Sequence, residues 1–334
     1  MAEIASLPQA IHPDILPRLD PEYVIQHNIH IAPKVAPHTL PWDPALRLRP
    51  AVPGGSPVSK VGSVRDIALK NCKIRVFTPE GEPPAKGWPV FIYFHGGGWT
   101  LGSIDTQNSF ASRQCKEHNC VSICVDYRLA PEHPYPAAVE DAVDALQWVH
   151  QNGKADLNAN VDVIAVGGSS SGGNLAAIIA LKATQFVPPI PITFQVLVVP
   201  VTDNTATSSG DPYPSWKECK DTPWLNVGRM MWFRHNYLPN EADWNKWDNS
   251  PIFAPDELLA KVAPAWVGVC ELDILRDEGI KYGERMESLG VKVDFDIYKG
   301  APHQIMSMDG VIEIGRKMVQ DATQALGKAF AAAV

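Results

Sequence analysis

Cysteine is scarce in this chain of 334 residues, which contains only six. They stand at positions 72, 115, 120, 124, 219 and 270 without a C-x-x-C pair, so a disulfide-built scaffold is excluded. Four of them lie in apolar runs such as VSICVDY, where a thiol behaves as a small hydrophobic group. An N-x-S/T glycosylation acceptor is also missing. Free, buried thiols and a cytoplasmic location are therefore expected.

An excess of basic residues is absent as well. Lysine and arginine number 29, aspartate and glutamate number 37, and the net charge is −8. This balance excludes a broad phosphate-binding face, so no nucleic-acid partner is expected. No stretch of about 18 apolar residues exists, and no membrane insertion is predicted. The opening residues MAEIASLPQAIHPD lack the basic and apolar regions of a secretory signal, so none is expected.

Long regular elements are not expected in two segments. Eleven of the 30 prolines precede residue 58. Because each proline removes a backbone donor and fixes φ, residues 1–56 are predicted to form an N-terminal arm with short helices, such as 21–30. Residues 203–255 are rich in Asp, Asn, Ser and Pro and hold five of the ten tryptophans. Long insertions of this kind are usually functional, and we predict a helical cap there.

Residues 57–202 and 256–334 alternate apolar strands with helices. Continuous apolar runs such as PVFIYFH indicate strands buried on both faces, and such strands separated by helices predict an α/β fold with a mostly parallel sheet. After an opening strand pair within 61–79, strands are expected at 89–95, 121–127, 161–168, 194–200, 265–270 and 293–298. Helices are expected at 109–118, 137–151, 171–184, 277–289 and 311–331.

The strongest chemical signal is the sequence VIAVGGSSSGGNLAA. Gly168, Ser170 and Gly172 form a G-x-S-x-G motif directly after a predicted strand and at the start of a predicted helix. The serine then sits on a sharp turn at the positive end of the helix, and the glycines let strand and helix approach. Of the three consecutive serines, only Ser170 has glycine at both −2 and +2, so it is the expected nucleophile. A phosphate-binding turn is the alternative interpretation.

A second glycine motif, HGGGW at 95–99, ends another predicted buried strand 75 residues before Ser170. Glycine leaves backbone N–H groups unshielded, as an oxyanion hole requires. Alone, the motif is also typical of a flexible loop. Together with G-x-S-x-G it indicates nucleophilic catalysis.

A general base is expected after the serine, preceded by an orienting acid. Only two of the ten histidines follow Ser170. His235 falls in the tryptophan-rich insertion, where a structural role is expected. His303 follows a predicted strand in the loop KGAPHQIM and is the expected base, because such a loop can present it over the sheet.

The orienting acid is expected in ELDILRDEG, after the preceding strand. Asp273 is far enough past that strand to turn toward His303 and is the expected acid. Glu271 remains a competing candidate. Asp277 and Glu278 are typical of the first turn of a helix, where the helix dipole favours acids.

Five segments together resemble the hormone-sensitive-lipase branch of the α/β-hydrolase carboxylesterases. HGGGW, DYRLAPEHPYPAA, GGSSSGGNLAA, ELDILRDEG and GAPH occur in the family's order, from about residue 60 to 310. The resemblance implies an α/β-hydrolase fold with an eight-stranded sheet and a cap formed by the arm and the insertion. It implies a catalytic triad of Ser170, Asp273 and His303. It also implies oxyanion donors from the N–H groups of Gly97, Gly98 and Ser171.

The resemblance implies structural roles for His95, Arg128 and Glu132. It further implies a serine carboxylesterase that acts on a small ester through an acyl-enzyme, with no metal or organic cofactor. The same machinery cleaves lactones, amides and thioesters, so a hydrolase of one secondary metabolite is an alternative. A receptor-like, non-catalytic member is another, but the plant gibberellin receptor has lost the catalytic histidine, which is present here.

The tryptophans suggest how large the substrate is. Trp99 adjoins the glycine motif, and Trp216 and Trp224 lie in the insertion. We expect them to line a closed aromatic pocket suited to short or medium acyl chains or aromatic substrates. A homodimer is left open.

Overall fold

An eight-stranded sheet forms the centre of the computed structural model, which describes residues 7–333; the first six residues of the expected arm lie outside them. The strand order is β1-β2-β4-β3-β5-β6-β7-β8. The strands are β1 (Ser63–Ala68), β2 (Lys73–Thr78), β3 (Trp88–Phe94), β4 (Val121–Asp126), β5 (Ala159–Ser169), β6 (Phe194–Val198), β7 (Ala265–Leu272) and β8 (Val293–Pro302). The β1–β2 and β2–β4 pairs are antiparallel and the other five pairs of this sheet are parallel, so the predicted mostly parallel sheet is confirmed.

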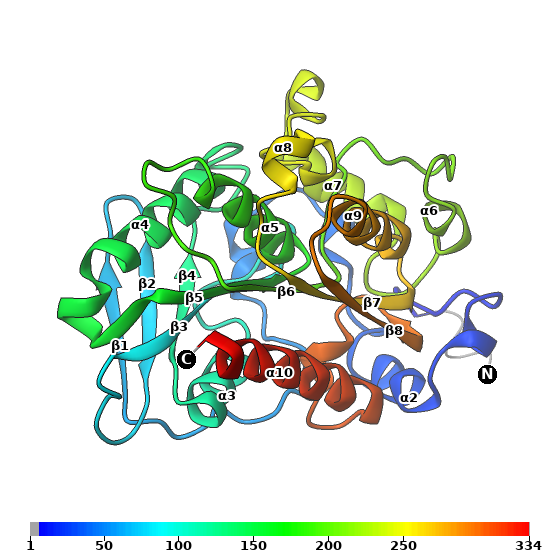
Figure 1. Ribbon diagram of the computed structural model, residues 1–334. Helices are drawn as coiled ribbons and strands as arrows, with labels where there is room; N and C mark the ends of the chain where they lie inside the picture. Colours follow the sequence, from blue (N-terminus) through cyan, green and yellow to red (C-terminus); the bar gives the residue numbers. More distant parts are fainter. Residues whose placement is uncertain (1–6, 334) are drawn as a thin grey trace.

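Helices cover both faces of the sheet (Figure 1). Above it in that view lie α4 (Ala137–Leu157), α5 (Ser171–Ala183) and α9 (Arg276–Ser288), and below it lie α3 (Asn108–His118) and α10 (Glu313–Ala333). Every residue of β3 is buried. Its side chains alternate between two apolar clusters, with Ile92 in one and Phe91 in the other, because successive strand residues point to opposite faces.

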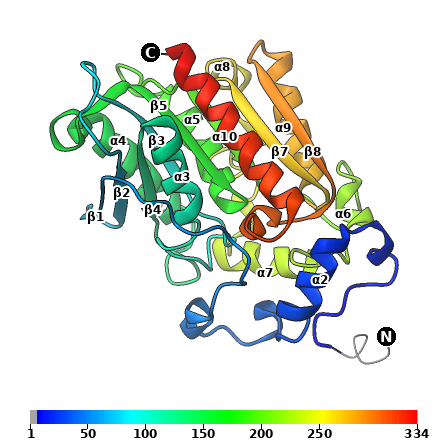
Figure 2. The same ribbon diagram turned by 90° about the horizontal axis from the view of Figure 1, so that it is seen from below.

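The arm and the insertion lie together at one end of the sheet. Within residues 7–56, the arm contains α2 (Pro21–His30) and three short 3-10 helices, η1 (Leu16–Arg18), η2 (Pro37–Thr39) and η3 (Pro44–Leu48). The insertion contains α6 (Ser215–Glu218), α7 (Val227–Tyr237), η4 (Glu241–Asp243) and η5 (Pro251–Phe253), and α8 (Asp256–Leu259) follows it. Figure 2 shows the arm and the insertion at the same end of the molecule, and the Trp42 and Trp232 rings join the two segments, with their centroids 6.0 Å apart. That the two segments act as one cap stays a prediction.

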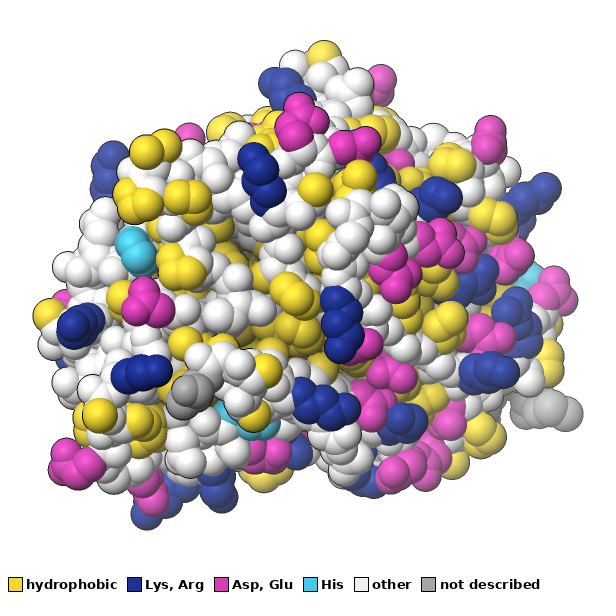
Figure 3. Space-filling model, viewed as in Figure 1, with side chains coloured by type: hydrophobic (Ala, Val, Ile, Leu, Met, Phe, Trp, Pro, Cys, Tyr) yellow, Lys and Arg dark blue, Asp and Glu magenta, His cyan; other side chains and the backbone are white. Residues whose placement is uncertain are grey.

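The surface carries both signs of charge. On the face drawn in Figure 3, basic and acidic side chains are interspersed, and no broad basic patch is visible. Within residues 7–333, no helix is long and apolar enough to span a membrane.

Candidate active site

Ser170 occupies the sharp turn between β5 and α5. Its φ of 56° and ψ of −119° lie outside the ordinary regions for a residue with a side chain, so the turn is strained. The neighbouring glycines explain how the turn is accommodated. A Cβ on Gly172 would stand 2.0 Å from the carbonyl oxygen of Phe94, and one on Gly168 would stand 2.2 Å from that of Gly172. The G-x-S-x-G spacing is therefore a packing requirement of the strand–helix junction.

Ser170, His303 and Asp273 are hydrogen-bonded in a line. His303 directly follows β8, and its Nε2 lies 2.9 Å from the Ser170 Oγ. Asp273 directly follows β7, and its Oδ2 accepts from the His303 Nδ1 at 2.7 Å. The other oxygen of Asp273 accepts from the backbone N–H of Leu275 at 3.0 Å. All three side chains are buried, so the structure brings together the three residues that the sequence analysis selected.

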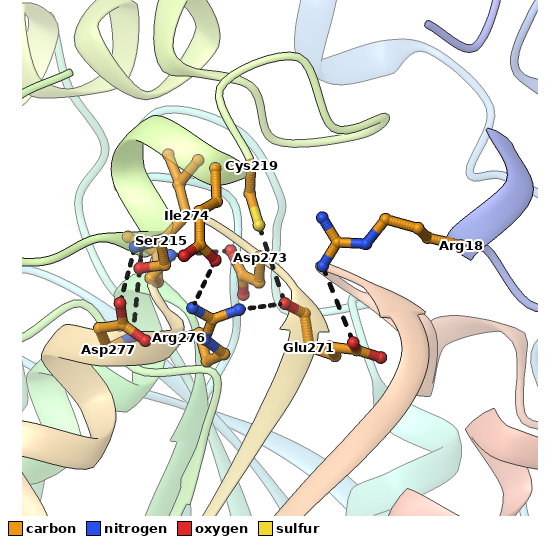
Figure 4. A network of polar contacts seen from close by, with 10 residues as sticks. Arg18, Ser215, Cys219, Glu271, Asp273, Ile274, Arg276 and Asp277 are labelled. Atoms are coloured by element: carbon orange, nitrogen blue, oxygen red, sulfur yellow. Dashed lines mark hydrogen bonds and ion pairs between the residues drawn. The ribbon is translucent and has the colours of Figure 1, made fainter. Parts of the chain in front are cut away.

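Glu271, the competing acid, is engaged elsewhere. Its Oε2 accepts from the N–H of Gly300 at 2.8 Å, and its Oε1 lies 3.8 Å from Arg18 of the arm. Figure 4 shows Glu271 directed toward Arg18, with Arg276 between Asp277 and the Glu271 backbone. Glu271 therefore links the arm to the sheet, and Asp273 is the acid of this pair that reaches His303.

The two serines beside Ser170 have other partners as well. The Ser169 hydroxyl bonds with the Gln107 amide at 3.0 Å, and the Ser171 hydroxyl lies 3.4 Å from the Tyr127 hydroxyl. His235 lies against Trp244, with ring centroids 6.0 Å apart. None of these side chains enters the line of hydrogen bonds.

The glycine loop at 95–98 provides free donors beside Ser170. The N–H groups of Gly97 and Gly98 have no acceptor among the described residues. Gly98 has a φ of +60°, and a Cβ there would stand 2.2 Å from the Phe233 ring. The N–H of Ser171 stands in the first turn of α5, where no intrahelical acceptor exists. These are the three donors expected from the sequence, and their catalytic use stays a prediction.

His95 supports this loop from within the protein. It is buried, its Nδ1–H donates to the Gly96 carbonyl at 2.8 Å, and its ring stacks on Tyr127 at 4.4 Å. Burial lowers the pKa of His95, which favours a neutral ring. The contacts fit the expected structural role.

A cavity of about 730 Å³ opens onto Ser170 and His303. Of the three tryptophans expected to line it, only Trp224 does so. Trp99 is fully buried against Tyr237, with stacked rings 4.3 Å apart. Trp216 is also fully buried, and its indole N–H donates to Glu278. The prediction was wrong for these two because they anchor the insertion to the sheet domain.

Several lining residues were missed in the sequence. The arm contributes Ile31, Leu46 and Val52, and α7 contributes Arg229 and Phe233. Arg229 and Phe233 are four residues apart and therefore lie on one face of α7, and this spacing in the sequence could have indicated that they line the same surface. The sequence contains no such indication for the arm residues, because only the tertiary fold brings them over the strand ends. Within residues 7–333, no three His, Cys, Asp or Glu side chains gather as metal ligands.

Comparison with known proteins gives consistent matches. The α/β-hydrolase fold family matches residues 91–307. An AB hydrolase superfamily protein of Schizosaccharomyces pombe is 43% identical over 94% of this chain and 95% of its own. Esterase LipI of Mycobacterium tuberculosis is 38% identical over 71% of this chain and 72% of its own. An α/β-hydrolase enzyme from the metagenome of Lake Arreo superposes with a TM-score of 0.83 at 30% identity, covering 94% of this chain and 99% of that one.

The sheet, the strained serine turn and the hydrogen-bonded histidine define a hydrolase of the serine type. The chain belongs to the α/β-hydrolase family, within its carboxylesterase-type branch. The fold class and the family expected from the motifs are confirmed.

Proposed function

We propose that the protein is a serine carboxylesterase in which Ser170, His303 and Asp273 form the catalytic triad. One observation carries the proposal: hydrogen bonds link Ser170 to His303 and His303 to Asp273, and both Ser170 and His303 line the cavity. A receptor-like, non-catalytic protein would lack the catalytic histidine, whereas this chain has His303 within hydrogen-bond distance of Ser170. Nothing observed favours lactones, amides or thioesters over esters.

The proposed reaction has two steps. In the first, the Ser170 Oγ attacks the ester carbonyl carbon while the His303 Nε2 takes the hydroxyl proton. His303 then gives this proton to the departing alkoxide, and the acyl group stays on Ser170. In the second step, a water molecule loses a proton to His303 and attacks the acyl carbon. The bond to the Ser170 Oγ breaks, the acid leaves, and Ser170 regains its proton.

One carboxylate and three backbone N–H groups stabilise the charges that develop in this reaction. Asp273 holds the Nδ1–H of His303 and offsets the imidazolium charge from a fully buried position. The N–H groups of Gly97, Gly98 and Ser171 bind the negative oxygen of the tetrahedral intermediate. Each such donor contributes roughly 10²-fold or more to kcat.

Hydrolysis of p-nitrophenyl butyrate by the purified protein tests the proposal. We expect activity in the wild type and a loss of roughly 10⁴-fold or more in kcat for Ser170→Ala. Ser169→Ala is the matched control, because its hydroxyl bonds with Gln107 and not with His303, and it should keep much of the activity. An active Ser170→Ala protein would refute the assignment.

We also propose that the protein works in the cytoplasm. All six cysteines are free and five are buried, in keeping with a reducing compartment. A homodimer is not needed for the proposed chemistry, because all three triad residues come from one chain.

A further inference from the structure

Basic side chains gather on part of the wall of the cavity that holds Ser170. Lys34 and Arg49 come from the arm, and Arg229 comes from the first turn of α7. None of the three forms an ion pair with a carboxylate among residues 7–333. Lys34 and Arg49 are exposed, whereas Arg229 is half-buried and is the inner member of the group.

The guanidinium of Arg229 has few partners in the protein. Its Nη1 donates to the carbonyl oxygen of Trp224 at 2.9 Å, which is the one acceptor that the described residues offer it. Its Cζ lies 5.8 Å from the Trp224 ring centre and 5.7 Å from that of Phe233. A guanidinium carries five N–H donors in a planar fork that suits a carboxylate. Most of those donors remain available to a ligand.

The charge on this guanidinium is not compensated locally. Burial lowers the pKa of Arg229 to about 10, and the nearby Tyr23 hydroxyl opposes this shift only in part. Arg229 therefore stays protonated at neutral pH. A partly desolvated charge without a counter-ion is unfavourable, and an anionic ligand in the cavity would relieve that cost.

The acidic residues of the cavity do not serve as counter-ions for Arg229. Asp105 pairs with Arg75, and Asp309 lies 3.6 Å from Arg113 and accepts from the N–H of Ser56. The remaining basic residue of the wall, Arg47, is paired with Glu132 at 2.6 Å. The uncompensated charge of the cavity is therefore positive, although the chain as a whole has a net charge of −8.

Arg229 also stands at a defined position relative to the glycine loop. Phe233, four residues later on α7, packs directly against Gly98. Arg229 is therefore about one helical turn, roughly 5.4 Å, farther along α7 from the loop. A carboxylate several bonds away from the scissile carbonyl would reach the guanidinium.

We propose that this cavity selects esters that carry a carboxylate, which Arg229 binds while Lys34 and Arg49 attract it at the cavity mouth. The inference rests on the proposed esterase function. The carboxylate belongs either to the acyl part, as in the half-ester of a dicarboxylic acid, or to the alcohol part.

Two matched pairs of substrates test this selection. Monoethyl adipate is compared with ethyl hexanoate, and 4-carboxybutyl butanoate with pentyl butanoate, by the kcat/KM for release of the alcohol. We expect the anionic member of at least one pair to be preferred, and the pair concerned shows which side carries the anion. In Arg229→Met this preference should fall roughly 10- to 100-fold, the effect of one charge-assisted contact.

Two further variants control for charge and for folding. Arg229→Lys keeps a cation and should retain part of the preference. Arg316→Met removes an arginine from α10, away from the cavity lining, and should retain all of it. Hydrolysis without a preference for either anionic ester, or a preference that survives Arg229→Met, overturns this inference alone. Failure to hydrolyse any ester overturns the proposed function with it.

Discussion

Replacing Asp273 by asparagine tests whether Asp273 is the acid that orients His303 in the proposed triad. The carboxylate has two fixed partners, because one oxygen accepts from His303 at 2.7 Å and the other accepts from the N–H of Leu275 at 3.0 Å. An asparagine amide offers one acceptor and one donor group. Its orientation is set by Leu275, because an NH₂ group facing that N–H would leave two buried donors without acceptors.

In the Asp273→Asn variant, the amide NH₂ group would therefore face the His303 ring. The ring nitrogen Nδ1 must then accept, and the proton moves to Nε2, where it blocks transfer from Ser170. Turning the amide over would restore the tautomer at a cost of about 1–3 kcal/mol for each unpaired buried group. We expect kcat for p-nitrophenyl butyrate to fall roughly 10³- to 10⁴-fold, with the fold retained.

Glu271→Gln is the matched control for this experiment. Glu271 accepts from Gly300 and pairs with Arg18 in a half-exposed position, so its loss should alter kcat by only a few-fold. Steady-state kinetics and circular dichroism of both variants provide the comparison. Near-normal kcat in Asp273→Asn together with a severe loss in Glu271→Gln would refute the assignment of the acid.

Three further results are expected. Gly98→Ala should lower kcat/KM for p-nitrophenyl butyrate by roughly 10²-fold or more, because its Cβ would meet Phe233 and displace an oxyanion donor; normal kinetics would contradict that role. Over p-nitrophenyl esters from acetate to palmitate, each methylene buried in the cavity should add about 0.8 kcal/mol of binding free energy, so kcat/KM should rise roughly fourfold per methylene to about C4–C8 and then fall. A maximum at palmitate would contradict the cavity argument. Burial and the charge of Asp203 raise the pKa of Glu278 from 4.5 to about 8, so its contribution to stability is present below pH 4.5 and is lost as the pH rises through 8. Urea unfolding should show this fall in the wild type and a weaker one in Glu278→Gln, and equal slopes would contradict it.

The sheet and its serine turn were predictable because both depend on local sequence. Continuous apolar runs mark strands buried on two faces, and β3 is buried throughout. The glycines around Ser170 are required by contacts as short as 2.0 Å between strand and helix. Chain order and strand ends selected Asp273 and His303, which the fold brings together.

The pocket was less predictable because its lining depends on tertiary packing. A tryptophan near the site can either line the cavity or anchor the wall, and composition does not distinguish these roles. Trp99 and Trp216 anchor the wall, while Trp224 lines the cavity. The sequence could not identify Arg229 as a candidate for ligand binding, because whether an arginine has an acidic partner depends on the tertiary structure.

The most direct test of the central claim is to locate the nucleophile chemically. The protein is treated with a fluorophosphonate, and the modified residue is identified by peptide mass spectrometry in the wild type and in Ser170→Ala. Ser169→Ala and Ser171→Ala serve as controls, because their hydroxyls contact Gln107 and Tyr127. The account predicts a single adduct on Ser170 in the wild type and both controls, and none in Ser170→Ala. An adduct on Ser169 or Ser171, or labelling that persists in Ser170→Ala, would contradict it.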